Sequence, residues 1–509
     1  TIQISPTTYI RCNESISHRA IAQTCLAYLF QFSGLESITT TNLASFPLAL
    51  YAARQCASHI TSIRGEDMDS TQKEFILQLA LPSTNCVLAN WSQLRHSAKR
   101  SYGTIDLDDT TIEHQNFAPS LYYASTIGLT PLVRKLIDNG ADLNELGGKW
   151  GTALQAASYE NHLEIARLLL ETGADVNAPG GEYGTALQAA SCQGHPEIAR
   201  LLLEKGADAN ATGGQYGTAL QVASRQGHLE IARLLLEKGA DINAMRGEYG
   251  TALQAASCWG HLEIARLLLE KGADINATGG QYGTTLGAAS GGGHLEIAQL
   301  LLEKGADVDA TGGEYGTALQ AASYEGHLEI ARLLLEKGAD VNATAGEYGT
   351  ALQVASLWGH LETARLLLEK GADINATGGY FGTALQAASW GGELETARLL
   401  LEKGADINAT GGAYGTALQT ASYWGNLEIA HLLLENGADV NLRGGQYGTA
   451  LQVAAYGEKF EIVKLLLEKG AEVNVRGGKR GSALQAARAT CYDREAKAIV
   501  QLLKEHGAL

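Results

Sequence analysis

One four-residue pattern recurs through most of this chain at a fixed interval. The pattern Gly-Thr/Ser-Ala/Thr-Leu begins at residues 151, 184, 217, 250, 283, 316, 349, 382, 415, 448 and 481, always 33 residues after the previous copy. A worn copy of the same segment begins one interval earlier, at residue 118, which makes twelve repeats. One repeat of this size cannot bury its own leucines, whereas stacked neighbours bury those of one another. The interval therefore predicts a solenoid over residues 118–509.

Each repeat carries the signals of two short helices and a turn. Thr152 and Gln155 have the spacing of a capping box, which opens a first helix rich in alanine and leucine. After a glycine, "HLEIARLLLEKG" predicts a second helix, with Glu early, Lys late and Gly just past its end. The next segment, "ADVNATGGEYG", holds the Asn and Gly residues that favour a tight turn with positive φ. The predicted order is helix, turn, helix and finger.

The repeat resembles the ankyrin repeat. The signature T-P-L-H-x-A of that family stands here as T-A-L-Q-x-A, with Ala for Pro and Gln for His, and the resemblance covers residues 118–509. It implies an all-α solenoid of helix-turn-helix repeats with β-hairpin fingers. In ankyrin-type proteins the first helices and the fingers line a concave face that binds protein partners.

The two ends of the predicted array depart from the consensus. Residues 118–150 form a degenerate first repeat, and residues 481–509 form a C-terminal cap, in which Lys504 replaces the third leucine of the second helix. A polar outward face is what the end of a solenoid needs. The last repeat also carries four extra residues around "TCYDRE", which we expect to form a loop.

The first 117 residues lack the 33-residue interval. The segments 17–32, 46–60 and 70–80 are predicted to be helices, and the first two are apolar at helical spacing. The simplest interpretation is a small helical domain over residues 1–117 that caps the open end of the solenoid.

A second resemblance concerns the same region. Its residues look like the helical segment between the NTPase and the ankyrin array of fungal NACHT–ankyrin proteins, with Cys56 where that pattern usually has Trp. The matching residues are His18, Cys25, Leu26, Tyr28, Leu29, Pro47, Leu48, Tyr51, Ala52, Ala53 and His59. The resemblance implies a nucleotide-driven switch upstream, with the array as its sensor. No Walker motif occurs in the chain itself, which starts at Thr1 without Met and is expected to continue upstream.

Charge and cysteine content narrow the class of partner. The net charge is −17, of which residues 118–509 hold −15, from 30 Lys and Arg against 45 Asp and Glu. An acidic surface argues against nucleic acid and favours neutral or basic protein partners. The seven cysteines show no paired spacing, which predicts a reducing, cytoplasmic setting. The sequence has no run of 18 apolar residues, so no membrane-spanning helix is predicted.

No set of residues predicts catalysis, a cofactor or a metal site. The fingers "GGKWGT" (147–152) and "GGKRGS" (477–482) lack the earlier Gly of a phosphate loop, since Leu143 and Val473 stand there. A histidine starts the second helix of seven repeats, from His162 to His360. Stacked helices are roughly 10 Å apart, so these side chains cannot share a zinc ion, whose ligands lie at about 2 Å. The chain is therefore predicted not to be an enzyme.

The positions that vary between repeats predict the binding surface. The largest variation falls on two residues after the Ser that is expected to end the first helix, and on the finger tips. Trp and Tyr most often carry interface energy, and four of the six tryptophans lie in these pairs. The predicted partner-binding residues are Tyr159, Arg225, Trp259, Tyr324, Trp358, Trp390, Tyr423, Trp424 and Tyr456 from the pairs, and Arg246, Tyr380 and Arg443 from the tips. The alternative is that these aromatic rings merely cover exposed helix ends.

Two further features complete the sequence-based expectations. An aromatic column in the fingers, one residue per repeat as at Tyr183 and Tyr216, is interpreted as a structural ladder because it hardly varies. The repeat beginning at Gly283 has Gly287 in place of the capping Gln and glycines at 291–293, which predicts a local weak point. The function that follows is protein recognition, as a sensor, as an adaptor or as the targeting arm of an enzyme whose catalytic domain lies elsewhere.

Overall fold

The computed structural model describes residues 21–25, 49–61, 70–80, 87–89, 91–92, 118–214, 216–489 and 494–509. The chain divides into two compact units, Thr1–Asp241 and Ile242–Leu509, called here the N-terminal and the C-terminal unit. Of the predicted helix 17–32, the structure describes only residues 21–25, and these are helical. The predicted boundary at residue 117 stays a prediction.

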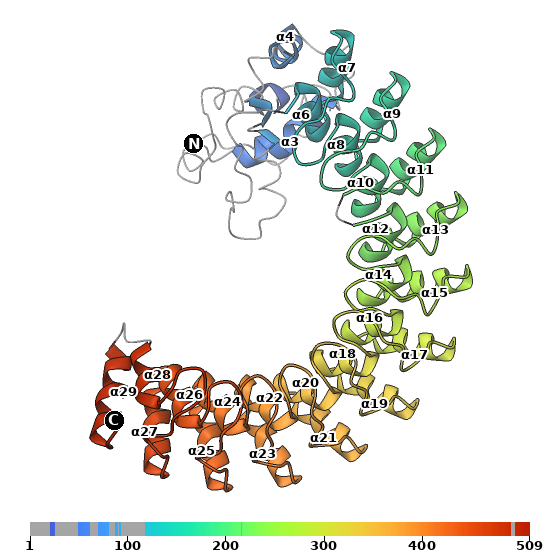
Figure 1. Cartoon of the computed structure of the whole chain (residues 1–509). Helices are drawn as coiled ribbons and strands as arrows, with labels where there is room; N and C mark the ends of the chain where they lie inside the picture. The colour runs from blue at the N-terminus through green and yellow to red at the C-terminus, as the bar shows by residue number, and fades with distance from the viewer. Residues whose placement is uncertain are drawn as a thin grey trace, which may run out of the picture. The chain divides into compact units, whose positions relative to one another are not determined.

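The N-terminal unit contains four helix pairs of the solenoid. In each pair a first helix is followed by an antiparallel second helix, and Figure 1 shows the two kinds in two parallel rows. The first helices are α6 (Ser120–Ile127), α8 (Ala153–Tyr159), α10 (Ala186–Gln193) and α12 (Ala219–Gln226). The second helices are α7 (Thr130–Asp138), α9 (Leu163–Glu171), α11 (Pro196–Glu204) and α13 (Leu229–Glu237).

The C-terminal unit contains eight further pairs, and in Figure 1 its first helices line the inner side of its curve. These are α14 (Ala252–Cys258), α16 (Thr285–Gly291), α18 (Ala318–Glu325), α20 (Ala351–Leu357), α22 (Ala384–Gly391), α24 (Ala417–Trp424), α26 (Ala450–Tyr456) and α28 (Ala483–Ala489). The second helices are α15 (Leu262–Glu270), α17 (Leu295–Glu303), α19 (Leu328–Glu336), α21 (Leu361–Glu369), α23 (Leu394–Glu402), α25 (Leu427–Glu435), α27 (Phe460–Glu468) and α29 (Arg494–Glu505). The predicted all-α solenoid is confirmed.

The predicted capping boxes open the first helices. At α24 the Gln419 N–H donates to Thr416 Oγ1 at 3.2 Å, and the Thr416 N–H donates to Gln419 Oε1 at 2.8 Å. Gly425, with φ of 91°, ends the helix by donating its N–H to the Ala421 carbonyl at 3.0 Å. Glycine adopts this left-handed conformation without steric cost, so the sequence fixes both helix ends.

The fingers are simpler than the predicted β-hairpins. Among the described residues they hold isolated antiparallel bridges, such as Gly312 with Gly316 and Gly411 with Gly415. Neighbouring fingers are joined by backbone bonds, as where the Glu314 N–H donates to the Gln281 carbonyl at 3.0 Å. Gly313 has φ of 63°, and a Cβ there would lie 2.3 Å from that carbonyl. The second finger glycine is thus needed both for the turn and for close stacking.

The core is one row of small and branched apolar side chains between the helices. In the pair α24–α25, Leu418, Ala421, Ile429 and Leu433 are all almost fully buried. Burying one such leucine or isoleucine stabilises the fold by about 1.5–3 kcal/mol. The alanines let adjacent first helices approach closely, which is why the core repeats with the sequence.

The N-terminal helices form a small core of their own. The predicted helices 46–60 and 70–80 correspond to α3 (Ala49–Thr61) and α4 (Ser70–Leu79). The indole N–H of the buried Trp91 donates to the Ala53 carbonyl at 2.9 Å. In this unit α4 also contacts α7, the second helix of the first repeat. No helix of the described residues has the length and apolarity to cross a bilayer.

The last repeat ends in a longer helix, α29 (Arg494–Glu505). The loop predicted for the four extra residues around "TCYDRE" falls on residues 490–493, which lie outside the described ones, and stays a prediction. Arg494 and Glu495 form the first turn of α29. Glu495 suits this place because a carboxylate stabilises the positive end of the helix dipole. Lys504 is exposed beside the buried Leu503, as a cap requires.

Candidate functional site

The variable residues lie at the C-terminal ends of the first helices, either in the last turn, as Tyr423 and Trp424 do, or directly after it, as Trp358 does. The expectation that Ser ends these helices is wrong, because α24 continues past Ser422 to Trp424 and α22 continues past Ser389 to Gly391. The helix ends where a left-handed glycine follows, and that glycine comes after the variable pair. The pair is therefore held on a rigid helical turn, which presents its side chains in a fixed direction.

The finger aromatics stack from repeat to repeat, as the ladder interpretation predicts. In the C-terminal unit the ring centroids lie 5.2 Å apart for Tyr282 and Tyr315, 6.4 Å for Tyr348 and Phe381, and 6.2 Å for Tyr414 and Tyr447. Offset aromatic pairs of this kind contribute about 0.5–1.5 kcal/mol each beyond the burial of their area. The ladder thus stabilises the stacking of the fingers.

The helix-end aromatics pack onto this ladder and join it into one surface. Trp390 lies 4.3 Å from Phe381 and 5.0 Å from Trp424, centroid to centroid. Tyr423 lies 4.7 Å from Tyr414 and 5.8 Å from Tyr447. We call this surface the aromatic band. It consists of Tyr282, Tyr315, Tyr348, Phe381, Tyr414 and Tyr447 from the fingers, Tyr324, Trp358, Trp390, Tyr423, Trp424 and Tyr456 from the helix ends, and Tyr380 from a finger tip.

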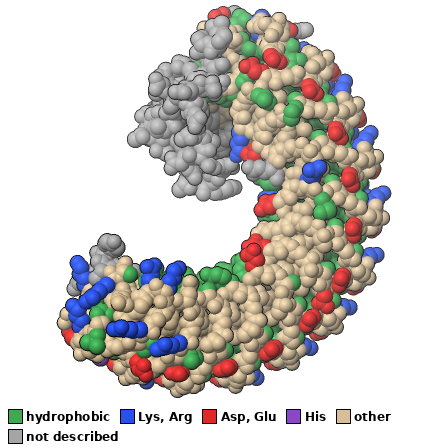
Figure 2. Space-filling model, in the orientation of Figure 1, with side chains coloured by type: hydrophobic (Ala, Val, Ile, Leu, Met, Phe, Trp, Pro, Cys, Tyr) green, Lys and Arg blue, Asp and Glu red, His purple; other side chains and the backbone are tan. Residues whose placement is uncertain are grey.

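Part of the aromatic band is buried and part is open to solvent. Tyr315 is 8% exposed, whereas Trp358, Tyr380 and Trp424 are 49%, 53% and 41% exposed. Figure 2 shows hydrophobic atoms gathered on the inner side of the C-terminal unit. Large apolar side chains grouped on a surface mark an interaction site more often than scattered ones do.

The finger ladder and the binding residues were predicted as two separate features, but in the structure their rings contact one another. A helix-end residue meets the finger ring nine residues earlier, as Tyr423 meets Tyr414, and the finger residue 24 positions later, as Tyr423 meets Tyr447. The same interval of 24 places the Arg480 guanidinium 4.9 Å from the Tyr456 ring. Arg480 and the finger rings were not among the predicted binding residues, although the spacings of nine and 24 residues, which add up to one repeat, point to them.

A smaller aromatic cluster lies in the N-terminal unit. The ring of Tyr159 stacks on Trp150 at 3.8 Å and on Tyr183 at 5.4 Å. Arg225 lies over the Tyr216 ring at 4.8 Å, which is the geometry of a cation–π contact. The predicted residues Tyr159 and Arg225 are thus both engaged with finger rings.

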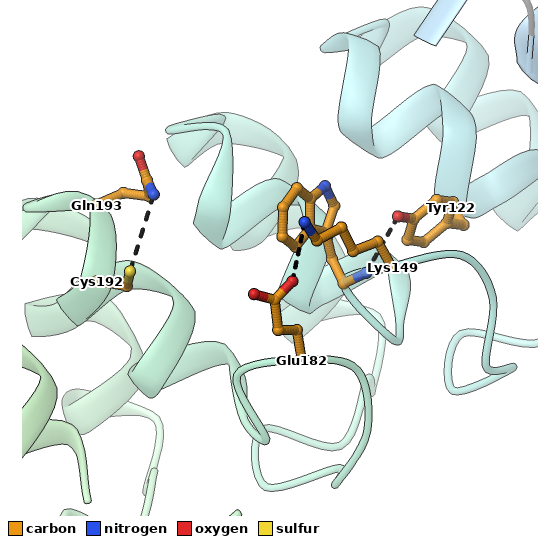
Figure 3. A network of polar contacts seen from close by, with 6 residues as sticks. Tyr122, Lys149, Glu182, Cys192 and Gln193 are labelled. Carbon is orange, nitrogen blue, oxygen red and sulfur yellow. Dashed lines mark hydrogen bonds and ion pairs between the residues drawn. The ribbon is translucent and has the colours of Figure 1, made fainter. Parts of the chain in front are cut away.

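Polar contacts fix the first finger of this cluster (Figure 3). The backbone N–H of Trp150 donates to the buried Tyr122 hydroxyl at 3.2 Å, and Lys149 forms an ion pair with Glu182 at 3.1 Å. On α10, the Gln193 amide lies 3.9 Å from Cys192 Sγ. Lys149, whose finger faintly resembles a phosphate loop, therefore has a carboxylate partner and also lies 5.0 Å from the Trp150 ring.

Besides Tyr159 and Arg225, three more predicted residues lie outside the aromatic band. Trp259 is 46% exposed and packs edge-on against Tyr249 at 6.2 Å. Arg246 and Arg443 are exposed on their finger tips. In the repeat that follows Trp259, Gly291 and Gly292 hold the places where other repeats carry aromatic residues.

Comparison with known proteins accounts for the repeat. A family model described as ankyrin repeats, three copies, matches residues 121–213, 213–279, 286–378, 346–411, 378–444 and 413–477. The chain belongs to the ankyrin repeat family. The azaphilone pigments biosynthesis cluster protein L of Monascus ruber is 33% identical over 155 residues, which is 28% of this chain and 32% of that protein. The chain thus spans about a third of the length of this relative.

The Gln that departs from the ankyrin signature has a second role besides capping. The Gln419 amide nitrogen donates to the Leu442 carbonyl at 2.8 Å and to the Gly448 carbonyl at 2.6 Å, both in the next finger. The equivalent Gln155 donates to Ala178 at 3.1 Å and to Gly184 at 2.7 Å. Where it is present, this side chain therefore ties the first helix to the finger that leads into the next repeat.

The histidine column also joins ankyrin repeats. His294 Nε2 lies 3.0 Å from the Cys258 carbonyl, and His360 Nε2 lies 2.9 Å from the Tyr324 carbonyl. At the same position Asn426 donates to the Trp390 carbonyl at 3.2 Å. In the described residues no group of three or more His, Cys, Asp or Glu side chains is placed to hold a metal ion.

Burial shifts the titration of several side chains at these positions. It raises the pKa of Tyr159, Tyr315 and Tyr348 to about 12, so these hydroxyls remain uncharged at neutral pH. It also lowers the pKa of His294, whose ring therefore resists protonation. The aromatic band is thus an uncharged surface, bordered by the charges of its finger tips.

Proposed function

We propose that the aromatic band binds protein and that this binding is the function of the array. The observation that carries the proposal is that the band is continuous and partly exposed, while the repeat at 283–315 stacks with Gly291 and Gly292 in the same places. The exposed rings are therefore not required for stacking. Aromatic side chains held rigidly in this way supply contact area at a low cost in conformational entropy.

The experiment replaces three tryptophans with Ala. They are Trp358, Trp390 and Trp424, which lie at the ends of the successive first helices α20, α22 and α24. The immobilised full chain and the variant are exposed to the same cell lysate, and the captured proteins are identified by mass spectrometry. Each residue that anchors a partner should cost about 2 kcal/mol or more in binding, so the specific partners should be lost.

A matched control changes three exposed side chains of the opposite helix row. Arg332, Arg365 and Arg398 stand on α19, α21 and α23, each in an i,i+3 ion pair of 3.7–3.8 Å. Such exposed pairs stabilise the fold by less than about 1 kcal/mol, so Ala there should leave folding and capture unchanged. If the tryptophan variant captures the same proteins as the parent, the aromatic band is not the binding surface.

The proposal includes a finer role, as the ligand-sensing half of a NACHT-type signalling NTPase. Its support is the resemblance of residues 18–59, of which Ala52, Ala53, Cys56 and His59 lie on α3. Partner binding to the band would then bias a nucleotide-driven switch. The test is to sequence the transcript upstream of Thr1, where an intact phosphate loop followed by an acidic strand end is expected. An upstream sequence without these motifs would leave the array as an adaptor.

A further inference from the structure

The charges beside the aromatic band are not evenly mixed. The residue before the finger aromatic is Glu314 and then Glu347 in two successive repeats. The equivalent residue of the last finger is Lys479, which precedes Arg480 instead of an aromatic residue. Residues 442–509 hold 11 Lys and Arg against 7 Asp and Glu, although the chain as a whole has a net charge of −17. In Figure 2, red, green and then blue atoms follow one another along the inner side of the C-terminal unit.

The acidic end of the band is built from two fingers and one helix end. Glu314, Glu325 and Glu347 are all exposed there. The Tyr348 hydroxyl donates to Glu314 Oε1 at 3.1 Å, which fixes this carboxylate beside the rings. The fingers 311–315 and 344–348 contain no Lys or Arg.

The basic end is built from the last two fingers. Arg443, Arg476 and Lys479 are exposed, and the fingers 442–447 and 475–480 contain no Asp or Glu. Arg480 Nη2 donates to the Tyr456 hydroxyl at 3.3 Å while its guanidinium lies over that ring. The guanidinium therefore continues the aromatic band directly into the cationic fingers.

The distance between the two ends sets the size of a ligand. Glu314 and Lys479 are five repeats apart in sequence. With about 10 Å between neighbouring helices the separation is roughly 50 Å, and an extended chain needs about 15 residues to cover it. Between the ends lie the exposed rings of Trp358, Tyr380 and Trp424.

We propose that the aromatic band binds an elongated peptide segment that carries opposite charges at its two ends. The basic end of this segment lies over Glu314 and Glu347, apolar or aromatic residues cover the tryptophans, and the acidic end lies over Arg476 and Lys479. Complementary charges at both ends fix the direction in which the segment docks. This inference rests on the proposed function, since it takes the band as the binding surface.

The test pans a phage library of random 16-residue peptides on the immobilised full chain. The enriched peptides are expected to have Lys or Arg at one end, Asp or Glu at the other and aromatic residues between. The affinity of a selected synthetic peptide is then measured by fluorescence anisotropy. A variant with Glu in place of both Arg476 and Lys479 should bind this peptide about tenfold or more weakly. A variant with Lys in place of both Glu314 and Glu347 should show a loss of the same size.

The matched control places the same charge change on the other helix row. Lys464 and Lys469 are exposed on α27 and at its C-terminal end, and their replacement by Glu should change the affinity less than twofold. Enriched peptides without segregated charges, or equal affinity in the Arg476 and Lys479 variant, would overturn this inference. Loss of binding in the tryptophan variant would still support the proposed function. Peptides that bind equally without the tryptophans would overturn both.

Discussion

Two repeats of the C-terminal unit share a fold and differ in the residues that matter most. The repeats 283–315 and 415–447 both form helix pairs, α16–α17 and α24–α25, with a threonine that caps the first helix. The first has Gly287 where the second has Gln419, and it has Gly291-Gly292 where the second has Tyr423-Trp424. One repeat is close to the minimum that stacks, and the other carries the densest part of the aromatic band.

The difference separates residues needed for stacking from residues that stacking leaves free. In the glycine repeat the Gly287 N–H still donates to Thr284 Oγ1 at 2.9 Å, so the helix cap survives without the amide. A Cβ at position 291 would lie 2.4 Å from the Tyr282 ring, so that ring lies over the space left by the glycine. The ladder of finger rings is thus preserved while the helix-end rings are absent.

The largest expected effect comes from giving the repeat 415–447 the glycine that the repeat 283–315 has at the equivalent position, Gly287. Gln419→Gly should cost about 3 kcal/mol of local stability, roughly 1 kcal/mol for glycine in a helix and about 1 kcal/mol for each of two lost bonds to the next finger. The measurement is hydrogen exchange of the amides of α24 and residues 442–448. Gln419→Ala, which removes the same two bonds without adding a glycine, should cost about 2 kcal/mol, and unchanged protection there would show that these bonds contribute nothing.

A second prediction compares the two repeats without any mutation. Helix α16 contains Gly287 and Gly291, and each should destabilise it by roughly 1 kcal/mol relative to alanine. Hydrogen exchange should therefore show lower protection for residues 285–303 than for residues 417–435, by on the order of 2 kcal/mol. Equal protection in the two segments would remove the predicted weak point.

The third prediction separates binding from packing. Trp424→Ala should lower the free energy of unfolding by only about 1 kcal/mol, because the ring is 41% exposed and Gly292 holds the same place in the other repeat. Leu418→Ala, at a site 1% exposed, is the reference for a packing residue and should cost about 2–5 kcal/mol in urea denaturation. A loss of that size for Trp424→Ala would favour the view that the rings merely cover helix ends.

The smallest effect concerns pH. Burial lowers the pKa of His294 in the folded chain, so the unfolded chain takes up a proton more readily, and stability falls as the pH drops below about 6.5. Asn426 makes the equivalent contact in the other repeat, and His294→Asn should therefore reduce the stability lost between pH 7.5 and 5.5 by under about 1 kcal/mol. Thermal unfolding at both pH values measures this, with the exposed His431→Asn as control. An unchanged pH dependence would show that His294 is not the group that titrates.

Much of the fold was predictable because each repeat contains its own signals. The spacing of Thr416 and Gln419 predicts the capping box, and Gly425 indicates the helix end. Capping and glycine conformations act within a few residues of the chain, so the sequence shows them directly. The end of the first helix was predicted two residues early because Ser422 was given the role that Gly425 plays. The second role of Gln419, as a donor to the next finger, depends on a neighbour 23–29 residues away and left no local signal.

By itself the sequence determined the interval of 33 residues, the helix ends and the apolar stripe, because capping, glycine conformations and side-chain burial are short-range effects repeated in every copy. It also singled out Trp358, Trp390 and Trp424 as positions that vary. Only the tertiary structure decided that these rings join the finger ladder in one aromatic band and that Arg480 extends it. Those contacts join residues nine or more positions apart, such as Trp390 with Phe381 and Arg480 with Tyr456, and the packing of the fingers against the helix ends brings them together.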